Sequence, residues 1–250
     1  MTAYAELQVT TNFSFLRGGS HPEELATRAA ALGLSAVAVA DRNTLAGVVR
    51  AHVQAKEAGI KLLVGARLDL ACGNSLLCFP ADRAAYGRLS RLLSLGRRRA
   101  PKGECELHLD DLEAFAEGQI VVALAPADTN TTCRPRESGD PLPPPCDAGE
   151  ARKTATPLGS PLSRGRQGFL EFLKTVACLF PGRAYLAAQC LHRGDDEAWL
   201  AALARLSEEA GLPLVATNDV HYHVPERRPL QDVLTCIREH VTLDEAGFRL

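Results

Sequence analysis

Residues 33–64 read GLSAVAVADRNTLAGVVRAHVQAKEAGIKLLV, and this stretch decides the fold class. The apolar run SAVAVA at 35–40 predicts a buried strand, and the segment 44–58 predicts a helix that Gly59 ends. The run KLLV at 61–64 predicts the next strand. A strand, a helix and a strand in this order are typical of a parallel sheet that is covered by helices.

The same alternation continues in both directions along the chain. It predicts further strands at 7–10, 76–79, 120–125, 185–188 and 214–217. It predicts further helices at 20–32, 81–95, 169–179 and 197–210, and a last helix that starts near Glu226. The first of these helices is expected to have Ser20 as its cap, Pro22 in its first turn and Glu23 three residues after the cap.

The number of predicted strands favours one architecture over another. Seven strands fit a closed α/β barrel better than a short open sheet, and an open doubly wound sheet is the alternative. In either architecture the carboxyl ends of the strands form the active face. Functional side chains are therefore expected where the strands end.

The composition is ordinary for a soluble globular protein. Of the 250 residues, 46% are hydrophobic and 23% are charged, and the formal net charge is −2. No global basic field attracts nucleic acid, so a contact with DNA requires a local patch. No apolar run approaches the ~18 residues that a membrane span requires. The first residues lack the basic start of a secretion signal, and the eight cysteines form no C-x-x-C pair. We expect reduced thiols, a cytoplasmic location and no membrane partner.

One segment interrupts the pattern of strands and helices. Residues 130–166 contain seven of the chain's 15 prolines and no aromatic residue. Such a composition buries too little apolar surface to offset the entropy of ordering the chain. We therefore expect a disordered insertion within one domain. A partner-binding segment with polyproline character at 143–145 is the alternative.

Three stretches carry a resemblance to a known family. They are ELQVTTNFSFLRGGSHPEELATRAAALGLSAVAVADRNTLAGVV (6–49), AGIKLLVGARLDL (58–70) and GLPLVATNDVHYHVPERRPLQDVLTCI (211–237). In this order and spacing they resemble the PHP domain that opens the C-family bacterial DNA polymerases. The segments NFSFLRG, ADRNTLAGVVRAH, LLSLGRRRAPKGEC and RGDDE are most similar to the error-prone branch.

The resemblance implies a distorted seven-stranded α/β barrel of the PHP type over residues 1–250, as a fragment of a longer polymerase chain. The parent protein would be an error-prone DNA-directed DNA polymerase that acts in damage-induced mutagenesis and translesion synthesis. Its implied partners are the polymerase core of the same chain, DNA, the sliding clamp and mutagenesis accessory proteins. Mg²⁺ is expected in the polymerase domain, beyond Leu250, and no cofactor is expected in this domain.

Family members that hydrolyse phosphodiesters hold a metal cluster at the mouth of the barrel, and this chain departs from their ligand pattern. The first motif, normally H-x-H-S, reads QVTT at 8–11. Arginine stands at three ligand positions, serine stands at the fourth-strand histidine, and only the last motif, NDVHY, keeps plausible ligands. The degenerate metal-site positions are Gln8, Thr10, Arg17, Asp41, Arg42, Arg67, Ser75, Asp219 and His221.

Arginine stays protonated at physiological pH, so it cannot act as a metal ligand and repels a divalent cation. We therefore expect a structural, metal-free module without catalytic residues. The alternative is a metal-dependent phosphoesterase or 3′-5′ exonuclease, which would need the histidines missing at positions 8, 10, 42 and 75. A binding module unrelated to polymerases is a further alternative.

The arginines are expected to replace the metals as partners of the acidic groups at the mouth. We predict at least one ion pair from Arg17, Arg42 or Arg67 to Asp41 or Asp219, because the planar guanidinium binds a carboxylate with two hydrogen bonds. For Asp219 and His221, a structural role in a strand-to-helix turn is favoured over metal binding.

One basic run stands outside the metal-site positions. It is interpreted either as a solvated helix face or as a patch that contacts the DNA backbone in the assembled polymerase. The run comprises Arg97, Arg98, Arg99 and Lys102.

Overall fold

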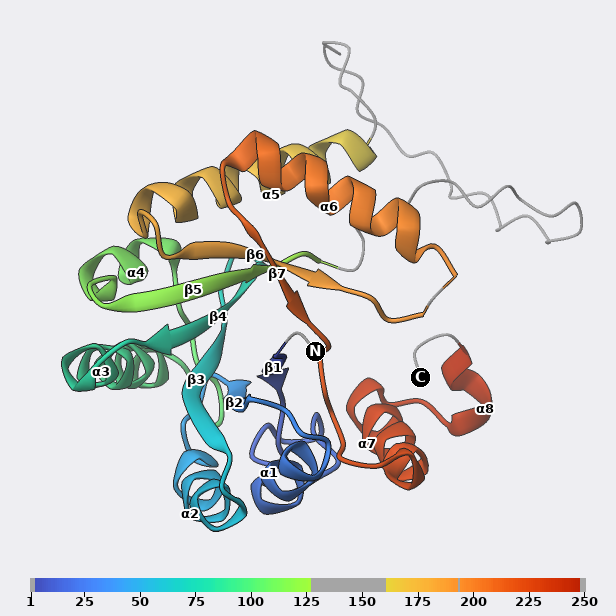
Figure 1. Ribbon diagram of the computed structural model, residues 1–250. Coiled ribbons are helices and arrows are strands. Elements are labelled where there is room, and N and C mark those ends of the chain that lie inside the picture. Colours follow the sequence, from blue (N-terminus) through green and yellow to red (C-terminus); the bar gives the residue numbers. More distant parts are fainter. Residues whose placement is uncertain (1–2, 127–160, 193, 248–250) are drawn as a thin grey trace, which may run out of the picture.

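Seven strands hydrogen-bond side by side in sequence order in the computed structural model of the protein (Figure 1). The structure describes residues 3–126, 161–192 and 194–247. The strands are β1 (Ala5–Val9), β2 (Ala36–Arg42), β3 (Lys61–Asp69), β4 (Ser75–Pro80), β5 (Gln119–Leu124), β6 (Ala184–Gln189) and β7 (Leu214–Thr217).

The sheet curls until its last strand reaches its first. Directly after β7, the Val220 N–H donates to the Gln8 carbonyl at 2.8 Å, and the Thr10 N–H donates to the Val220 carbonyl at 2.9 Å. This bridge between Val9 and Val220 nearly closes a seven-stranded barrel. The predicted barrel is thereby confirmed, and the alternative of an open doubly wound sheet is excluded.

Strand direction differs from the prediction at β4. The sequence predicted a parallel sheet, but β4 runs antiparallel to both β3 and β5. Only residues 70–74 connect β3 to β4, which is too short for the crossover that parallel strands need. As a consequence, the first residue of β4, Ser75, lies at the same end of the barrel as the last residues of β2 and β3.

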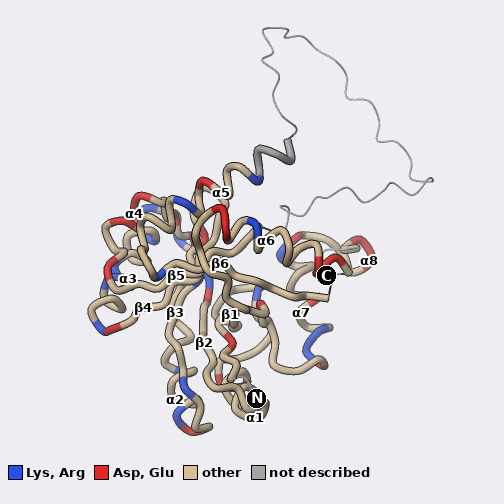
Figure 2. The backbone as a smooth tube through the Cα atoms, turned by 45° about the horizontal axis from the view of Figure 1, so that its top comes forward, with Lys and Arg blue, Asp and Glu red and all other residues tan. Residues whose placement is uncertain are grey.

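The helices pack on the outside of the barrel (Figure 1). They are α1 (Pro22–Ala31), α2 (Val48–Ala58), α3 (Arg83–Arg99), α4 (Leu109–Phe115), α5 (Pro161–Leu179), α6 (Asp196–Ala210), α7 (Arg228–Glu239) and α8 (Leu243–Ala246), with a short 3₁₀ turn η2 (Pro225–Arg227). Within the described ranges, no helix is long and apolar enough to cross a membrane. Figure 2 shows acidic and basic residues interspersed along the helices, as the small net charge implies.

Two predicted helix starts are corrected by the structure. Helix α1 has His21 as its N-cap, not Ser20, and the His21 N–H donates to Glu24 at 2.9 Å. The Ser20 hydroxyl instead contacts His223 at 2.7 Å, which ties the start of α1 to the segment after β7. Helix α2 begins at Val48, because the preceding residues form a turn.

The predicted insertion, 130–166, lies mostly outside the described residues. Its last part, 161–166, instead begins α5, where Pro161 fits the first turn because it needs no N–H partner there. Helices α4 and α8 were not predicted. Strand β3 is longer than predicted and runs to Asp69, a difference that matters for the site.

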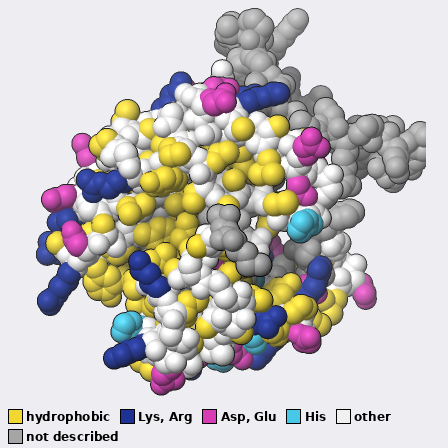
Figure 3. Space-filling view, in the orientation of Figure 1, with side chains coloured by type: hydrophobic (Ala, Val, Ile, Leu, Met, Phe, Trp, Pro, Cys, Tyr) yellow, Lys and Arg dark blue, Asp and Glu magenta, His cyan; other side chains and the backbone are white. Residues whose placement is uncertain are grey.

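Hydrophobic side chains fill the space between the sheet and the helices. The largest cluster packs α3, α5 and α6 onto β3–β6 and includes Leu68, Leu89, Leu173 and Leu186, all fully buried. A smaller cluster, with Leu77 and Ala187 among its members, packs inside the barrel. Figure 3 shows further hydrophobic side chains gathered on the surface over β4–β6. The core fixes the strands and thereby the side chains at their ends.

Candidate functional site

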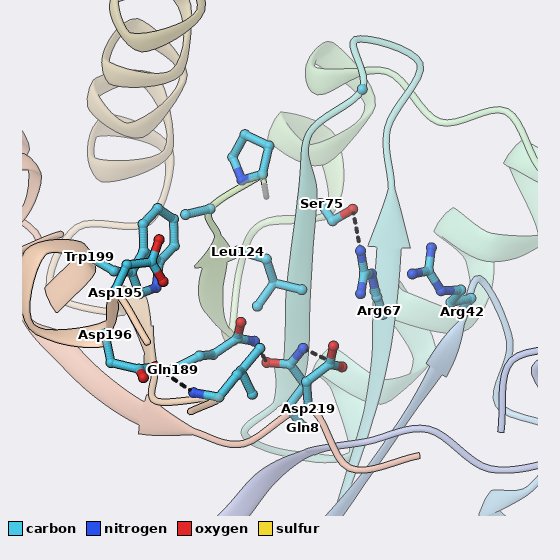
Figure 4. Close-up of a pocket in the computed structure, with 14 residues that line it drawn as sticks. Gln8, Arg42, Arg67, Ser75, Leu124, Gln189, Asp195, Asp196, Trp199 and Asp219 are labelled. Atoms are coloured by element: carbon cyan, nitrogen blue, oxygen red, sulfur yellow. Dashed lines mark hydrogen bonds between the residues drawn. The ribbon is translucent and has the colours of Figure 1, made fainter. Parts of the chain in front are cut away.

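The predicted metal-site positions gather at one mouth of the barrel. A cavity of about 240 Å³ at this mouth is lined by five of them, which project from β1, β2, β3, β4 and the segment after β7 (Figure 4). These five are Gln8, Arg42, Arg67, Ser75 and Asp219. Thr10 is buried just beyond β1, and Asp41 is fully buried in β2. The topology thus brings together residues that lie far apart in the sequence.

Two of the arginines at this mouth share one carboxylate. Arg42 donates from its guanidinium to Asp69 at 2.8 Å, and Arg67 donates to the same carboxylate at 2.9 Å. The Ser75 hydroxyl donates to Asp69 at 2.7 Å and also lies 3.1 Å from the Arg67 guanidinium. We call Arg42, Arg67, Asp69 and Ser75 the arginine clasp. It links the ends of β2 and β3 with the start of β4.

The arginine clasp corrects the predicted partners. The prediction named Asp41 or Asp219 as the carboxylate, but the acceptor is Asp69. Arg67 and Asp69 lie two residues apart on β3 and so project to the same face, and Arg42 lies beside Arg67 in the parallel register. Burial alone would raise the pKa of Asp69, but the charges of Arg42 and Arg67 outweigh it and lower that pKa. The carboxylate is therefore ionised at neutral pH.

Asp41 instead anchors the loop between β1 and α1. Its carboxylate accepts from the Thr11 N–H at 2.8 Å, the Thr11 hydroxyl at 2.8 Å and the Ser14 hydroxyl at 2.7 Å. Burial raises the pKa of Asp41 although these hydrogen bonds oppose the shift. With all three donors held by one fully buried side chain, the loop that carries Arg17 is fixed onto the end of β2.

Gln8, a predicted metal-site position, bridges three strands. Its amide donates to Asp219 at 2.7 Å, and its carbonyl accepts from Gln189 at 2.7 Å (Figure 4). The same carbonyl accepts from the Thr217 hydroxyl at 2.9 Å. The side chain is 2% exposed, so these partners satisfy a polar group that has little access to water. The amide thus joins β1 to β6 and β7, where a metal ligand would stand in the family pattern.

His221 lies between two acceptors. Its Nδ1 is 3.0 Å from the Arg17 carbonyl and its Nε2 is 3.3 Å from the Asp219 carboxylate. Because neither acceptor carries a proton, both ring nitrogens must donate, which favours the charged imidazolium. Burial would lower the pKa of His221, but Asp219 outweighs it and raises that pKa. Burial would raise the pKa of Asp219, but His221 and Arg67 outweigh it and lower that pKa to about 2.

This pair predicts a pH dependence of stability. The raised pKa means that the contribution of His221 is present below its unfolded pKa of about 6.5 and is lost as the pH rises through the folded value. We expect the free energy of unfolding of the wild type to fall between pH 6 and pH 8 more steeply than that of a His221→Gln variant. Urea unfolding of both proteins in chelator-treated buffer measures the two slopes. Equal slopes would contradict the ion pair.

Arg17 is one of the three arginines of the ion-pair prediction, and no carboxylate within the described ranges pairs with it. Among the residues that the structure describes, its half-buried guanidinium forms no ion pair. Burial, and then the neighbouring Arg42 and Arg238, lower its pKa to about 10, so it stays charged at neutral pH. Asp69 offsets this charge only in part, so the side chain adds positive charge beside the mouth.

The four residues of the basic run have different surroundings in the structure. Arg99 binds the Asp111 carboxylate with two hydrogen bonds of 2.7 and 2.9 Å. Arg97 donates to the Asn43 carbonyl at 3.0 Å and lines a groove together with Lys102 and Arg17. Arg98 is exposed at the end of α3, outside this groove. Arg97 and Lys102 thus remain candidates for anion contact, whereas Arg99 has a structural partner.

Sequence reasoning missed Asp69 and Gln189. A signal for Asp69 exists, since a strand that continues through LLVGARLDL places positions 67 and 69 on one face. No comparable signal marks Gln189, because its contact with Gln8 depends on how far the barrel closes.

The side chains at the mouth do not fit a catalytic metal cluster. Such a cluster needs several converging imidazole and carboxylate ligands, whereas here guanidinium, amide and hydroxyl groups occupy most of the positions. Asp69 and Asp219 are engaged by arginine, glutamine and histidine. Within the described ranges, the single group of three potential ligands with donor atoms within 4.8 Å of one another is Cys190, His192 and Asp196, at the end of β6.

Comparison with known proteins identifies the family. Residues 6–185 match the family model of the PHP domain. Over 248 residues the chain is 46% identical to an error-prone DNA polymerase of Caulobacter vibrioides, covering 99% of this chain and 20% of that protein. Error-prone DNA polymerase 1 of Agrobacterium fabrum is 45% identical, over 98% of this chain and 19% of that protein. The chain spans about a fifth of the length of these curated relatives.

Solved structures support the fold. A putative metal-dependent phosphoesterase from Bifidobacterium adolescentis superposes with a TM-score of 0.55 at 16% identity, covering 88% of both chains. An amidohydrolase from Chromobacterium violaceum, solved with bound sulfate and no metal, superposes with a TM-score of 0.58 at 15% identity. At such low identity these likenesses concern the fold alone. With the family model matching most of the barrel, the chain belongs to the PHP domain family.

Proposed function

We propose that the chain is the N-terminal PHP domain of an error-prone DNA-directed DNA polymerase that acts in damage-induced mutagenesis and translesion synthesis. The identity of about 45% to such polymerases over almost the whole chain supports this proposal. The partners would be the polymerase core of the same chain, DNA, the sliding clamp and mutagenesis accessory proteins. Mg²⁺ would act in the polymerase domain, and the protein would work in the cytoplasm.

Within that polymerase, the barrel is a structural module without a catalytic metal. The arginine clasp is the observation that carries this part of the proposal, because two guanidinium groups and their shared carboxylate stand at the metal-site end of β2 and β3. The clasp joins three strands as a metal cluster would, and it leaves no surplus negative charge to attract a cation. The module would hold the barrel mouth in shape for the rest of the polymerase.

The purified protein is expected to contain no stoichiometric zinc, manganese or iron. Growth in medium supplemented with all three metals, followed by elemental analysis of the dialysed protein, measures this. A Cys190→Ser variant is the matched control, because it removes one ligand of the exposed group at the end of β6 and leaves the mouth intact. Two or more tightly bound ions that persist in Cys190→Ser would contradict the metal-free mouth.

The phosphoesterase alternative has its own assay. A single-stranded oligonucleotide labelled at its 5′ end, incubated with the protein and Mn²⁺, should stay intact. Shortening from the 3′ end that disappears in an Asp219→Asn variant would revive the exonuclease. The polymerase proposal is tested separately by reading the gene beyond codon 250, where a continuing frame with paired polymerase aspartates is expected.

A further inference from the structure

A second depression adjoins the mouth on the side of the β1–α1 loop. It is a groove of about 740 Å³ between that loop, the end of β2 and the end of α3. Arg42 borders both this groove and the mouth cavity, so the two are neighbours. We call it the loop groove. Its lining residues that matter here are Phe13, Phe15, Arg17, Arg42, Arg97 and Lys102.

The loop groove is strongly positive. Arg17, Arg42, Arg97 and Lys102 line it, and Glu104 is its single acidic lining residue. Across the described part of the chain, Arg17, Arg97 and Lys102 form no ion pair with a carboxylate. Arg42 is neutralised in part by Asp69, which it shares with Arg67. Three basic side chains from two separate segments therefore present to one space positive charge that no ion pair among the described residues neutralises.

The charge of Arg17 is offset only in part within the folded chain. Its guanidinium is half-buried, and the nearby charges of Arg42 and Arg238 disfavour its own, while Asp69 favours it and burial and the two arginines outweigh that carboxylate. Such an arrangement destabilises the folded chain, because a partly desolvated cation normally has an anionic partner. An anion bound in the loop groove would supply that partner. The loop is nonetheless held in place by Asp41, so the positive charge is built into a fixed element.

Aromatic rings stand beside the cations. Phe15 is 84% exposed, although burying such a ring is strongly favourable. Phe13 lines the same groove, with the Arg50 guanidinium 5.9 Å from its ring centroid. An exposed aromatic ring next to phosphate-binding side chains is the usual arrangement of single-strand binding sites, because bases stack on the ring while cations follow the backbone.

We propose that the loop groove binds a single-stranded nucleic acid segment. Arg17, Arg97 and Lys102 contact successive phosphates, and a base stacks on Phe15. A duplex cannot offer the flat face of a base to Phe15, because its bases are already stacked on one another. An acidic peptide would satisfy the cations but offers no flat ring for Phe15. The inference rests on the proposed function, which already names DNA as a partner, and assigns a single-stranded segment to this groove. Oligonucleotide binding tests the groove, and the reading frame beyond codon 250 tests the polymerase, so the two can fail separately.

Fluorescence anisotropy with a labelled oligothymidylate of about 12 nucleotides tests the proposal on the purified protein. Three phosphate contacts predict a slope of log affinity against log salt of about −2, since each single-strand contact contributes about −0.7. Arg17→Gln and Lys102→Gln should each weaken binding and reduce the slope by about 0.7. Arg98→Gln is the matched control, because Arg98 lies on the same helix as Arg97 but outside the groove, and it should change neither quantity.

Phe15→Ala separates stacking from charge. It should weaken oligothymidylate binding about tenfold and leave the salt slope unchanged, because the lost contact is uncharged. The melting temperature of Arg17→Gln should equal or exceed that of the wild type, so that its lost binding is not lost folding. Lys102→Gln changes an exposed position, so weaker binding by this variant is likewise not lost folding.

Several results would overturn the proposal. No binding at low salt would do so, as would equal weakening by Arg98→Gln and Arg17→Gln, which would mean diffuse attraction. Competition by polyglutamate as strong as by unlabelled oligothymidylate, together with unchanged binding by Phe15→Ala, would assign the groove to an acidic chain. Tighter binding of a duplex of equal length would exclude the stacking contact.

Discussion

Replacing Asp69 by alanine is expected to lower the free energy of unfolding by about 2–4 kcal/mol. The substitution removes the only carboxylate to which Arg42 and Arg67 are bound among the described residues, and it leaves the Ser75 hydroxyl without its acceptor. The side chains of Arg42 and Arg67 are 24% and 17% exposed, so water would replace the lost carboxylate only in part. The two guanidinium charges, on neighbouring strands and partly shielded from water, would then repel each other.

Urea unfolding followed by circular dichroism measures the loss. Asp69→Asn should be intermediate, because it keeps an acceptor for Ser75 and removes the charge. Glu209→Ala is the matched control, since its pair with Arg166 is largely exposed and should contribute less than about 1 kcal/mol. A loss for Asp69→Ala no larger than that for Glu209→Ala would mean that the clasp does not stabilise the barrel.

Replacing Asp41 by alanine is expected to have a still larger effect, about 3–5 kcal/mol. The carboxylate is fully buried and accepts from three donors on Thr11 and Ser14, each of which would lose its partner. An unsatisfied buried donor costs about 1–3 kcal/mol. Relaxation of the loop would recover part of the sum, because the hydroxyls can turn to other acceptors.

Asp41→Asn separates the hydrogen bonds from the charge. The amide keeps one strong acceptor and offers a donor to the Thr11 hydroxyl, so we expect a loss of about half that of the alanine variant. Thermal and urea unfolding measure the loss of unfolding free energy in Asp41→Asn and in Asp41→Ala. An Asp41→Ala protein within about 1 kcal/mol of the wild type would contradict the role of Asp41 as the anchor of the loop.

Local sequence patterns predict most of the strands and helices of the barrel. Apolar runs such as 36–40 mark the strands because those residues are buried on both faces, and glycines such as Gly59 end helices with a positive φ, here 71°. The direction of β4 was predicted wrongly because β3 was predicted to end at Val64, which left residues 65–75 as the apparent connection, whereas only residues 70–74 connect the two strands. Local chain length decides that direction more strongly than the pattern does.

The site was predictable in part. Gln8, Arg42 and Arg67, which the family pattern names as metal-site positions, line one mouth cavity, because strand order brings strand ends together. The carboxylate partner was missed because β3 was predicted to end at Val64, which removed Asp69 from the strand. That Arg17 forms no ion pair with any described residue depends on the path of a loop held by Asp41, and no local pattern encodes this path.

The closure of the barrel has a consequence for its motions. Every other junction between neighbouring strands is a ladder of several residue pairs, whereas β1 and the segment after β7 meet at a single bridge. Two backbone hydrogen bonds and the side chains of Gln8 and Glu6 hold this seam, which joins residues about 211 positions apart in the chain. Local opening requires the least free energy where the fewest bonds break, so we expect the barrel to open first at this seam. Hydrogen exchange of the Thr10 and Val220 amides would then be faster than that of amides in the ladders between the other strands.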